Sequence, residues 1–136
     1  MNKNENSAMS HKSRRETGLE MIKEVYAGDV EVPEKGLAFI DVMLEQLFAE
    51  LWTRETLSMR DKRILLLGII AEKGEPATFK VQVKASLKRG EMNSEEAREL
   101  LLFIAQYAGY PRAASLIGPI EEAIAEAGSD PAQGDS

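Results

Sequence analysis

Three arginines and a tryptophan carry the clearest potential for chemistry in this sequence. Arg54, Arg60 and Arg63 lie close together in the chain, and Trp52 directly precedes them. A guanidinium group presents a fork of N–H donors that matches a carboxylate. An indole ring can form the wall of a pocket beside such a clamp. These four residues are therefore candidates for binding a small carboxylated molecule.

Structural roles are an open alternative for the same side chains. Trp52 can equally fill a core or an interface, because aromatic rings carry much of the apolar surface that folding buries. Arg60 and Arg63 share one face of a predicted helix and can form salt bridges instead of binding a substrate. The acids expected as their partners are Glu50, Glu55 and Asp61.

Side chains that commonly carry covalent or acid–base catalysis are scarce. The sequence has no cysteine and one histidine, His11, close to the N-terminus. Thiol catalysis, cysteine zinc sites and iron–sulfur clusters held by thiolates are therefore excluded, and we expect neither a metal nor a cofactor. Glu75 is a candidate proton donor. Its place directly before Pro76 is also typical of an acid at the start of a helix.

Length and charge limit the class of protein further. A chain of 136 residues is typical of one domain and can bury a core without disulfides or metals. Its 17 basic and 23 acidic residues give a net charge of −6, which argues against a nucleic-acid partner. No apolar run is long enough to span a membrane, and the N-terminus lacks the apolar region of a secretory signal. We therefore expect a soluble, cytoplasmic protein without a membrane partner.

Hydrophobic periodicity predicts six helices and no strand, so the expected fold class is all-α. Start and stop signals mark several helix ends. Ser58 and Asn93 are N-cap residues, Pro76 suits a first helical turn, and Gly74 suits a C-cap. The predicted helices cover about residues 13–27, 34–52, 59–73, 76–89, 94–108 and 111–124. Pro119 lies inside the last pattern and is expected to kink it.

The third predicted helix is expected at the centre of the fold. It contains Ile64-Leu-Leu-Leu-Gly-Ile-Ile70, which is apolar all round and must be covered on every side. A buried strand is the competing interpretation, but the charged helix formers that flank the run favour a helix. The polar segments 1–12 and 128–136 are predicted to be disordered tails around a single folded domain, residues 13–127.

The order of features from Phe48 onward resembles the carboxymuconolactone decarboxylase family. This helical superfamily also contains the alkyl hydroperoxidase D-type peroxidases, and the resemblance implies an alkyl hydroperoxidase D-like helical bundle over 13–127. The junction Tyr107-Ala-Gly-Tyr-Pro111 is the most characteristic segment. The other matching segments are Phe48-Ala-Glu-Leu-Trp-Thr-Arg54, Leu57-Ser-Met-Arg60, the apolar helix, Gly74-Glu-Pro76, Val81–Gly90 and Asn93-Ser-Glu-Glu96.

The resemblance also implies where a site would lie. Peroxidase members carry Cys-x-x-Cys-x-x-x-His, with the histidine eight residues before the glycine that ends that helix. Counting back from Gly90 places Gln82 at the histidine, and Thr78 and Glu75 at the two cysteines. The proton-relay glutamate of those members falls near Arg63. A thiol peroxidase is therefore excluded, and a glutamine side chain cannot transfer a proton near neutral pH.

Two functions of different classes follow from the resemblance and the residues. The first is a cofactor-free decarboxylase or isomerase, a carbon–carbon lyase acting on a small carboxylated lactone or ring acid. In that enzyme Gln82 and Glu75 would be catalytic, and the residues named first above would bind the substrate. The alternative is a non-catalytic oligomeric module that binds a small acid or a partner protein.

Self-association is expected in either case. The resemblance implies a trimer or a hexamer, and the sequence carries more apolar side chains than one central helix can cover. A monomer would expose them as a patch, which soluble monomers rarely tolerate. The alternative is that the first helix folds over the patch within one chain. The residues concerned are Phe39, Phe103, Tyr107, Tyr110, Ile117 and Ile120.

Overall fold

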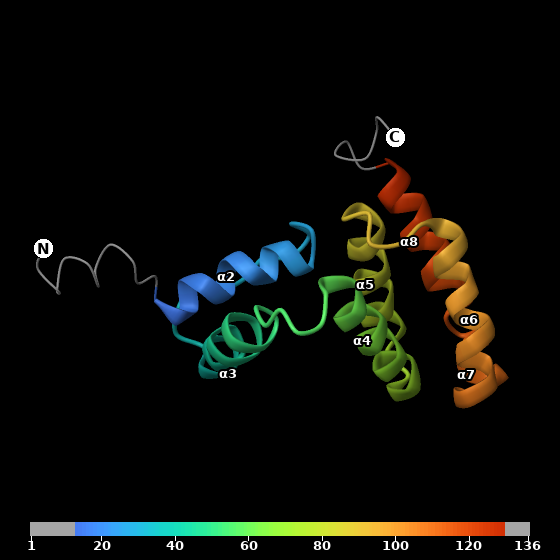
Figure 1. Ribbon diagram of the computed structural model, residues 1–136, viewed down its shortest axis with the longest axis horizontal. Coiled ribbons are helices and arrows are strands. Elements are labelled where there is room, and N and C mark those ends of the chain that lie inside the picture. The colour runs from blue at the N-terminus through green and yellow to red at the C-terminus, as the bar shows by residue number, and fades with distance from the viewer. Residues whose placement is uncertain (1–12, 130–136) are drawn as a thin grey trace, which may run out of the picture. The chain divides into compact units, whose positions relative to one another are not determined.

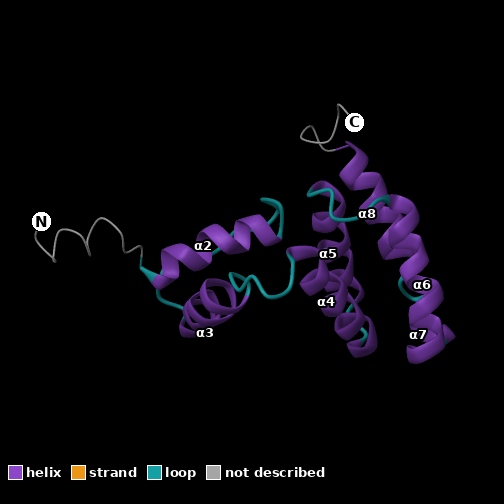
Figure 2. Cartoon of the chain, viewed as in Figure 1, coloured by secondary structure: helices purple, strands orange, loops and turns teal. Residues whose placement is uncertain are grey.

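Helices account for all the regular structure in a computed structural model of the protein, which describes residues 13–129 (Figure 1). Within that range the chain alternates helices with short loops and contains no strand (Figure 2). The expected all-α fold class is therefore confirmed. The single domain expected over 13–127 is built as two compact units, which divide between Thr56 and Leu57. The predicted arm 1–12 with His11, and residues 130–136 of the predicted tail, lie outside the described residues.

The first unit is a pair of helical segments that pack side by side. Helix α2 covers Arg14–Val25 and begins at Ser13, whose side chain accepts a hydrogen bond from the Glu16 amide at 3.1 Å. Helix α3 covers Ala38–Val42 and continues directly into η1, Met43–Leu51. The helix predicted from residue 34 therefore begins later, at Ala38. Helix α2 packs along η1 and buries four apolar side chains: Ile22, Val25, Leu44 and Phe48.

The segment η1 is a π-helix, which the sequence pattern does not predict. At its end the Trp52 amide donates to the carbonyl of Leu47, five residues earlier, at 2.9 Å. π-Helices are rare and usually limited to one turn. Here the wider helix places Leu44, Phe48 and Trp52, each four residues apart, on the buried side.

A close backbone approach holds α2 against η1. A Cβ atom added to Gly18 would lie 2.1 Å from the carbonyl oxygen of Leu44. Any larger residue at this position must push the two helices apart. Helix α2 is also tied to α3, because Arg15 Nε donates to Asp41 Oδ1 at 2.8 Å. This hydrogen bond lowers the pKa of Asp41 below its ordinary value.

The second unit contains the remaining helices, and their ends follow the predicted signals. Helices α4, Met59–Lys73, and α5, Pro76–Lys88, are joined by Gly74 in a left-handed conformation. Helices α6, Ser94–Ala108, α7, Tyr110–Ala114, and α8, Ile117–Ser129, complete the unit. Helix α5 packs along α8 and against α4. Their buried core includes Leu67, Ile70, Phe79, Val83, Leu116, Ile120 and Ala123.

The last predicted helix is broken earlier than expected. Ser115 and Leu116 separate α7 from α8, whereas the kink was predicted at Pro119. Pro119 lies in the first turn of α8, where its missing N–H leaves no helical hydrogen bond unmade. The prediction of a kink at Pro119 is therefore wrong. Helix α8 also reaches Ser129, beyond the start of the predicted tail at 128.

One expectation about buried side chains is corrected in the structure. Within the second unit one side of α4 stays uncovered, where Leu65 and Ile69 are 58% and 47% exposed. Ile120, expected in an exposed patch, is fully buried against α5 and α8 neighbours. The other members of that expected patch are exposed: Phe39, Phe103, Tyr107, Tyr110 and Ile117.

Removing the N-cap of α6 is expected to cost about 1 kcal/mol of unfolding free energy. The Asn93 side chain accepts from the Glu96 amide at 2.8 Å, and the Glu96 carboxylate accepts from the Asn93 amide at 3.0 Å, which completes the predicted capping box. Asn93→Ala leaves the first amide donors of the helix without the side-chain acceptor. Urea unfolding should separate this variant from Asn93→Asp, which keeps an acceptor. Equal stability of the two variants would contradict the assignment.

Candidate functional site

A fully buried arginine marks the centre of the candidate site. Arg63 lies on α4 with no exposed surface, and its Nη1 donates to Oε1 of Gln82 at 2.5 Å. Gln82 lies on the inner side of α5 and is also buried. Of the four positions that the family resemblance points to, those of the histidine and the proton-relay glutamate are thus in direct contact. A buried guanidinium needs a counter-charge, because desolvating an isolated ion is costly.

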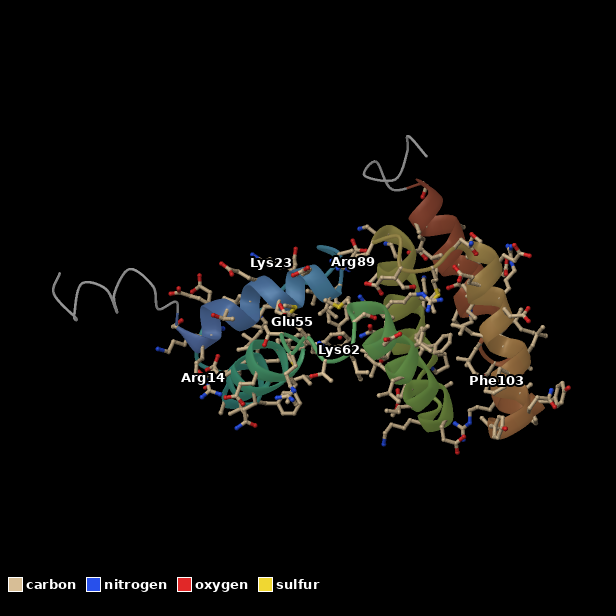
Figure 3. The ribbon with its side chains drawn as sticks, viewed as in Figure 1. Arg14, Lys23, Glu55, Lys62, Arg89 and Phe103 are labelled. Carbon is tan, nitrogen blue, oxygen red and sulfur yellow. The ribbon has the colours of Figure 1, made fainter. Side chains whose placement is uncertain are left out.

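Glu91 supplies that counter-charge. Its carboxylate accepts from Arg63 Nε at 2.9 Å and from Arg63 Nη2 at 3.2 Å, a two-pronged geometry typical of strong arginine–carboxylate pairs. Arg89, labelled in Figure 3, donates its Nε to the same carboxylate at 2.7 Å. One acid therefore lies between two arginines, and the Glu91 side chain is itself nearly buried.

The turn at the end of α5 brings Glu91 to this position. Gly90 has a φ of +73°, a conformation that favours glycine. Its amide donates to Leu87 O at 3.1 Å, and the Glu91 amide donates to Ser86 O at 2.9 Å. These two bonds form the Schellman motif that commonly ends a helix. The chain folds back on itself there, so that an acid beyond the helix reaches an arginine on α4.

Hydrogen bonding in this cluster is complete. No buried side-chain nitrogen or oxygen in residues 13–129 lacks a hydrogen-bond partner. Ser86, fully buried one turn after Gln82, donates its hydroxyl to Val83 O at 2.7 Å. The buried polar side chains around Gln82 therefore satisfy one another's hydrogen bonding.

Arg60 also contacts the segment around Glu91. Its Nε donates to the Glu91 carbonyl at 2.8 Å, and its Nη2 lies 3.1 Å from the Glu96 carboxylate. Salt bridges were expected for the two α4 arginines, and both form them. Their acidic partners, Glu91 for Arg63 and Glu96 for Arg60, differ from the acids predicted.

Of the remaining predicted site residues, Glu75 does not join the cluster. Glu75 is the exposed N-cap residue of α5, two turns and about 10 Å along the helix axis before Gln82. Trp52 and Arg54 belong to the first unit. Trp52 is 8% exposed, and its ring stacks on that of Phe48, with ring centroids 6.4 Å apart and planes at 8°. Trp52 therefore acts as a core residue of that unit.

Glu91 is the functional-site residue that sequence reasoning missed. Its neighbours give no periodic signal, because it lies between two helices. The available clue was Gly90, which as a C-cap glycine predicts a reversal of the chain directly before an acid. The identity of the arginine that this acid meets depends on tertiary packing, and no local pattern carries that information.

An open groove lies beside the buried cluster, between α4 and α6. Its volume is about 480 Å³. Arg60 and the acids Glu96 and Glu99 line its polar side, and Phe103, labelled in Figure 3, lies among its apolar residues. The other apolar residues that line it are Ile64, Met92, Leu100 and Leu102. The groove can take an apolar ring, while its carboxylates outnumber its single guanidinium.

Two kinds of site are absent from the described part of the chain. Across residues 13–129 no group of three or more histidine, cysteine, aspartate or glutamate side chains is arranged to hold a metal ion. Among the helices described, none has the length and apolar character needed to cross a membrane.

Fold and site together define an all-helical protein with a buried polar cluster between two central helices, at the place where the resemblance puts family catalytic residues. The chain belongs to the carboxymuconolactone decarboxylase family. The family model matches residues 38–122, which is more than half of the sequence and runs from the start of α3 into α8. Neither the comparison with curated proteins nor the comparison with solved structures finds a match.

Proposed function

We propose that this protein is a non-catalytic, oligomeric binding module of the carboxymuconolactone decarboxylase family. The observation that carries the proposal is the closed cluster of Arg63, Gln82 and Glu91. At the place where the resemblance puts a family histidine and a proton-relay glutamate, this chain has an amide and a guanidinium bonded to each other. Neither an amide nor a guanidinium is among the side chains that usually serve as general acids or bases.

Packing around the cluster supports a structural role for it. A reacting molecule at Gln82 would have to displace the Arg63 guanidinium, which fills the space beside the amide. Displacement would also separate Arg63 from Glu91, and breaking a buried ion pair costs about 3–5 kcal/mol. A substrate would have to supply that free energy before any chemistry began. Such a cluster is better suited to holding α4, α5 and the turn after α5 together than to catalysing a reaction.

The exposed apolar side chains support the oligomeric part of the proposal. Phe103 and Tyr107 are 70% and 83% exposed on α6, and their rings lie 5.1 Å apart. Phe39 on α3 is also largely exposed. Surfaces of this kind are typical of contacts between chains. The family resemblance implies a trimer or a hexamer, and we propose that these faces take part in it.

A second candidate function rests on the groove between α4 and α6. There a small carboxylated lactone or ring acid would place its ring against Phe103 and Leu100. The carboxylate of the ligand would replace that of Glu96 as the ion-pair partner of Arg60. This is the site at which a cofactor-free decarboxylase or isomerase would operate. In such an enzyme, replacing Arg60 by alanine would lower turnover and a metal chelator would leave it unchanged.

Wild-type protein is expected to release no carbon dioxide from carboxymuconolactone above the rate with heat-killed protein. The physical reason is that Gln82 and Arg63 stand where the resemblance implies proton-transferring side chains, and that the one carboxylate of the cluster, Glu91, is bonded to Arg63 and Arg89. The same protein should reduce no alkyl hydroperoxide with a dithiol donor, because it has no cysteine. Spectrophotometric assays of both reactions test the proposal.

Turnover that falls on Arg60→Ala but not on Gln82→Ala would support the groove enzyme in place of the non-catalytic module. A lower turnover in the Gln82→Ala variant, with the fold intact by circular dichroism, would overturn the interpretation of the cluster as structural. Binding of a ring acid without turnover, measured by calorimetry and lost in Arg60→Ala, would support a module that binds a small acid.

A further inference from the structure

The groove between α4 and α6 has a polar side whose charges do not balance. All of its lining residues belong to the second unit, and its volume of about 480 Å³ is typical of pockets that hold small molecules. The charged residues that line it are Arg60, Glu96 and Glu99. Two carboxylates and one guanidinium leave one negative charge in excess.

Arg60 and Glu96 already bind each other. Arg60 Nη2 lies 3.1 Å from one carboxylate oxygen of Glu96, and the other oxygen accepts from the Asn93 amide at 3.0 Å. The Nε of Arg60 is also used, because it donates to the Glu91 carbonyl at 2.8 Å. The guanidinium charge is therefore compensated within the chain, and an anionic ligand would have to compete with Glu96 for it.

Glu99 is the carboxylate that has no counter-charge. It is exposed on α6, and no side chain in residues 13–129 forms an ion pair or a hydrogen bond with its carboxylate. The adjacent cation, Arg98, donates its Nε and its Nη2 to the carboxylate of Glu121, each at 2.8 Å. The excess negative charge of the groove is therefore that of Glu99.

Two aromatic residues follow Glu99 along the same side of α6. Phe103 and Tyr107 come at four-residue steps, a spacing that makes side chains neighbours on a helix surface. Their rings lie 5.1 Å apart with planes tilted at 45°, and Phe103 lines the groove while it is 70% exposed. An aromatic face attracts a cation. The ring of Phe103 and the carboxylate of Glu99 therefore favour the same sign of ligand charge.

The apolar side of the groove requires an apolar group on the same ligand. Ile64 of α4 and Leu100 of α6 contribute aliphatic side chains to it. Met92 also lines the groove, and a methionine side chain adapts to the shape of the group that packs against it. A cation without an apolar group would leave this surface in contact with water.

We infer that the groove binds a small organic cation, an amine that carries an apolar ring, with the ammonium group beside Glu99 and Phe103. This inference rests on the proposed binding module and names its ligand class. It competes with the ring acid of the second candidate function, which needs Arg60 released from Glu96. The observations favour the amine, because Glu99 lacks a counter-charge and Arg60 has one.

Three matched probes test the sign of the preferred charge. Phenethylamine, phenethyl alcohol and hydrocinnamate share a phenyl ring and a two-carbon spacer, and their end groups are cationic, neutral and anionic. Titrations of the full chain followed by nuclear magnetic resonance measure the dissociation constants. We expect the amine to bind about three- to tenfold more tightly than the alcohol, from one exposed charge pair and one aromatic face. The acid should bind more weakly than the alcohol.

Substitutions on α6 test the position of the ammonium group. Glu99→Gln should weaken binding of the amine about two- to fivefold and leave binding of the alcohol unchanged. Glu95→Gln is the matched control, because Glu95 is an exposed glutamate of the same helix that does not line the groove, and it should change neither. Phe103→Leu keeps an apolar side chain without an aromatic face, so that it should weaken binding of the amine more than binding of the alcohol.

Light scattering accompanies these titrations, because Phe103 is also among the residues proposed for self-association. Glu99→Gln and Glu95→Gln should keep the wild-type mass. If Phe103→Leu changes the mass, the comparison of Glu99→Gln with Glu95→Gln decides the inference alone.

The outcomes separate this inference from the proposed function. An amine that binds no more tightly than the alcohol, or that binds Glu99→Gln as tightly as wild type, would overturn the inference. Tighter binding of the acid, lost in Arg60→Ala, would overturn it in favour of the ring-acid candidate. If no probe binds, the groove is not a site for an amine, whereas the non-catalytic assignment and the self-association still depend on the turnover assays and on the measured mass.

Discussion

Replacing Glu91 by alanine is expected to lower the free energy of unfolding by about 3–5 kcal/mol, a large share of the roughly 5–15 kcal/mol of an ordinary domain. The variant leaves the Arg63 guanidinium fully buried without its counter-charge. It also removes one acceptor of Arg89, which contributes less because that side chain is partly exposed. Urea unfolding followed by far-ultraviolet circular dichroism measures the loss.

A double variant provides the control for this prediction. Arg63→Met with Glu91→Leu removes both charges together and leaves no ion buried alone. Replacing a buried ion pair by apolar residues is often neutral or stabilising, so that the double variant should be far more stable than Glu91→Ala. If the free energy of unfolding of Glu91→Ala lies within about 0.5 kcal/mol of the wild-type value, as for a surface substitution, the cluster does not hold the helices together.

Gly18→Ala is expected to lower the stability of the first unit by about 1–3 kcal/mol, although alanine is the better helix former by about 1 kcal/mol. The added methyl group would lie 2.1 Å from the Leu44 carbonyl oxygen, a distance that backbone atoms cannot accommodate without moving. Helix α2 must then separate from η1. Trp52, the single tryptophan of the sequence, is buried in this unit, and its fluorescence during urea unfolding reports the change.

Gly68→Ala is the matched substitution for comparison. Gly68 is also helical, but a Cβ there would have no atom within 4 Å. The change should leave stability equal or slightly higher, because alanine favours the helix and meets no neighbour. A Gly18→Ala protein as stable as Gly68→Ala would show that the two helices of the first unit are not in backbone contact.

Helix ends in the second unit were predictable because their signals are local. Ser58 and Asn93 cap their helices through hydrogen bonds that reach only three residues along the chain. Gly74 and Pro76 act through the conformation of their own backbone. Signals of this range can be read from the sequence without knowing the tertiary structure. The same holds for the fold class, which follows from the periodicity of the apolar residues.

Features that depend on contacts between distant segments were not predictable. From the sequence alone, Gly18 is only a residue of low helix propensity. Its role follows from the close contact with Leu44, 26 residues later, which the sequence does not show. The π-helix η1 and the break at Ser115 likewise have no local signal. In the candidate site, Arg63 and Gln82 stand at positions that the family resemblance identifies, and they are in contact. The position of Glu91 beside Arg63 depends on the direction of the turn after α5, which is known only from the folded chain.

The pairing of helices also sets an order for folding during synthesis. Helices α2 and η1, the partners in the first unit, both lie before Thr56, so this unit has all of its packing surface while most of the second unit is still to be made. Helix α5 differs, because its largest partner is α8, the last helix of the described chain. Phe79 and Val83 on α5 therefore stay open to solvent and to chaperones until α8 has been made.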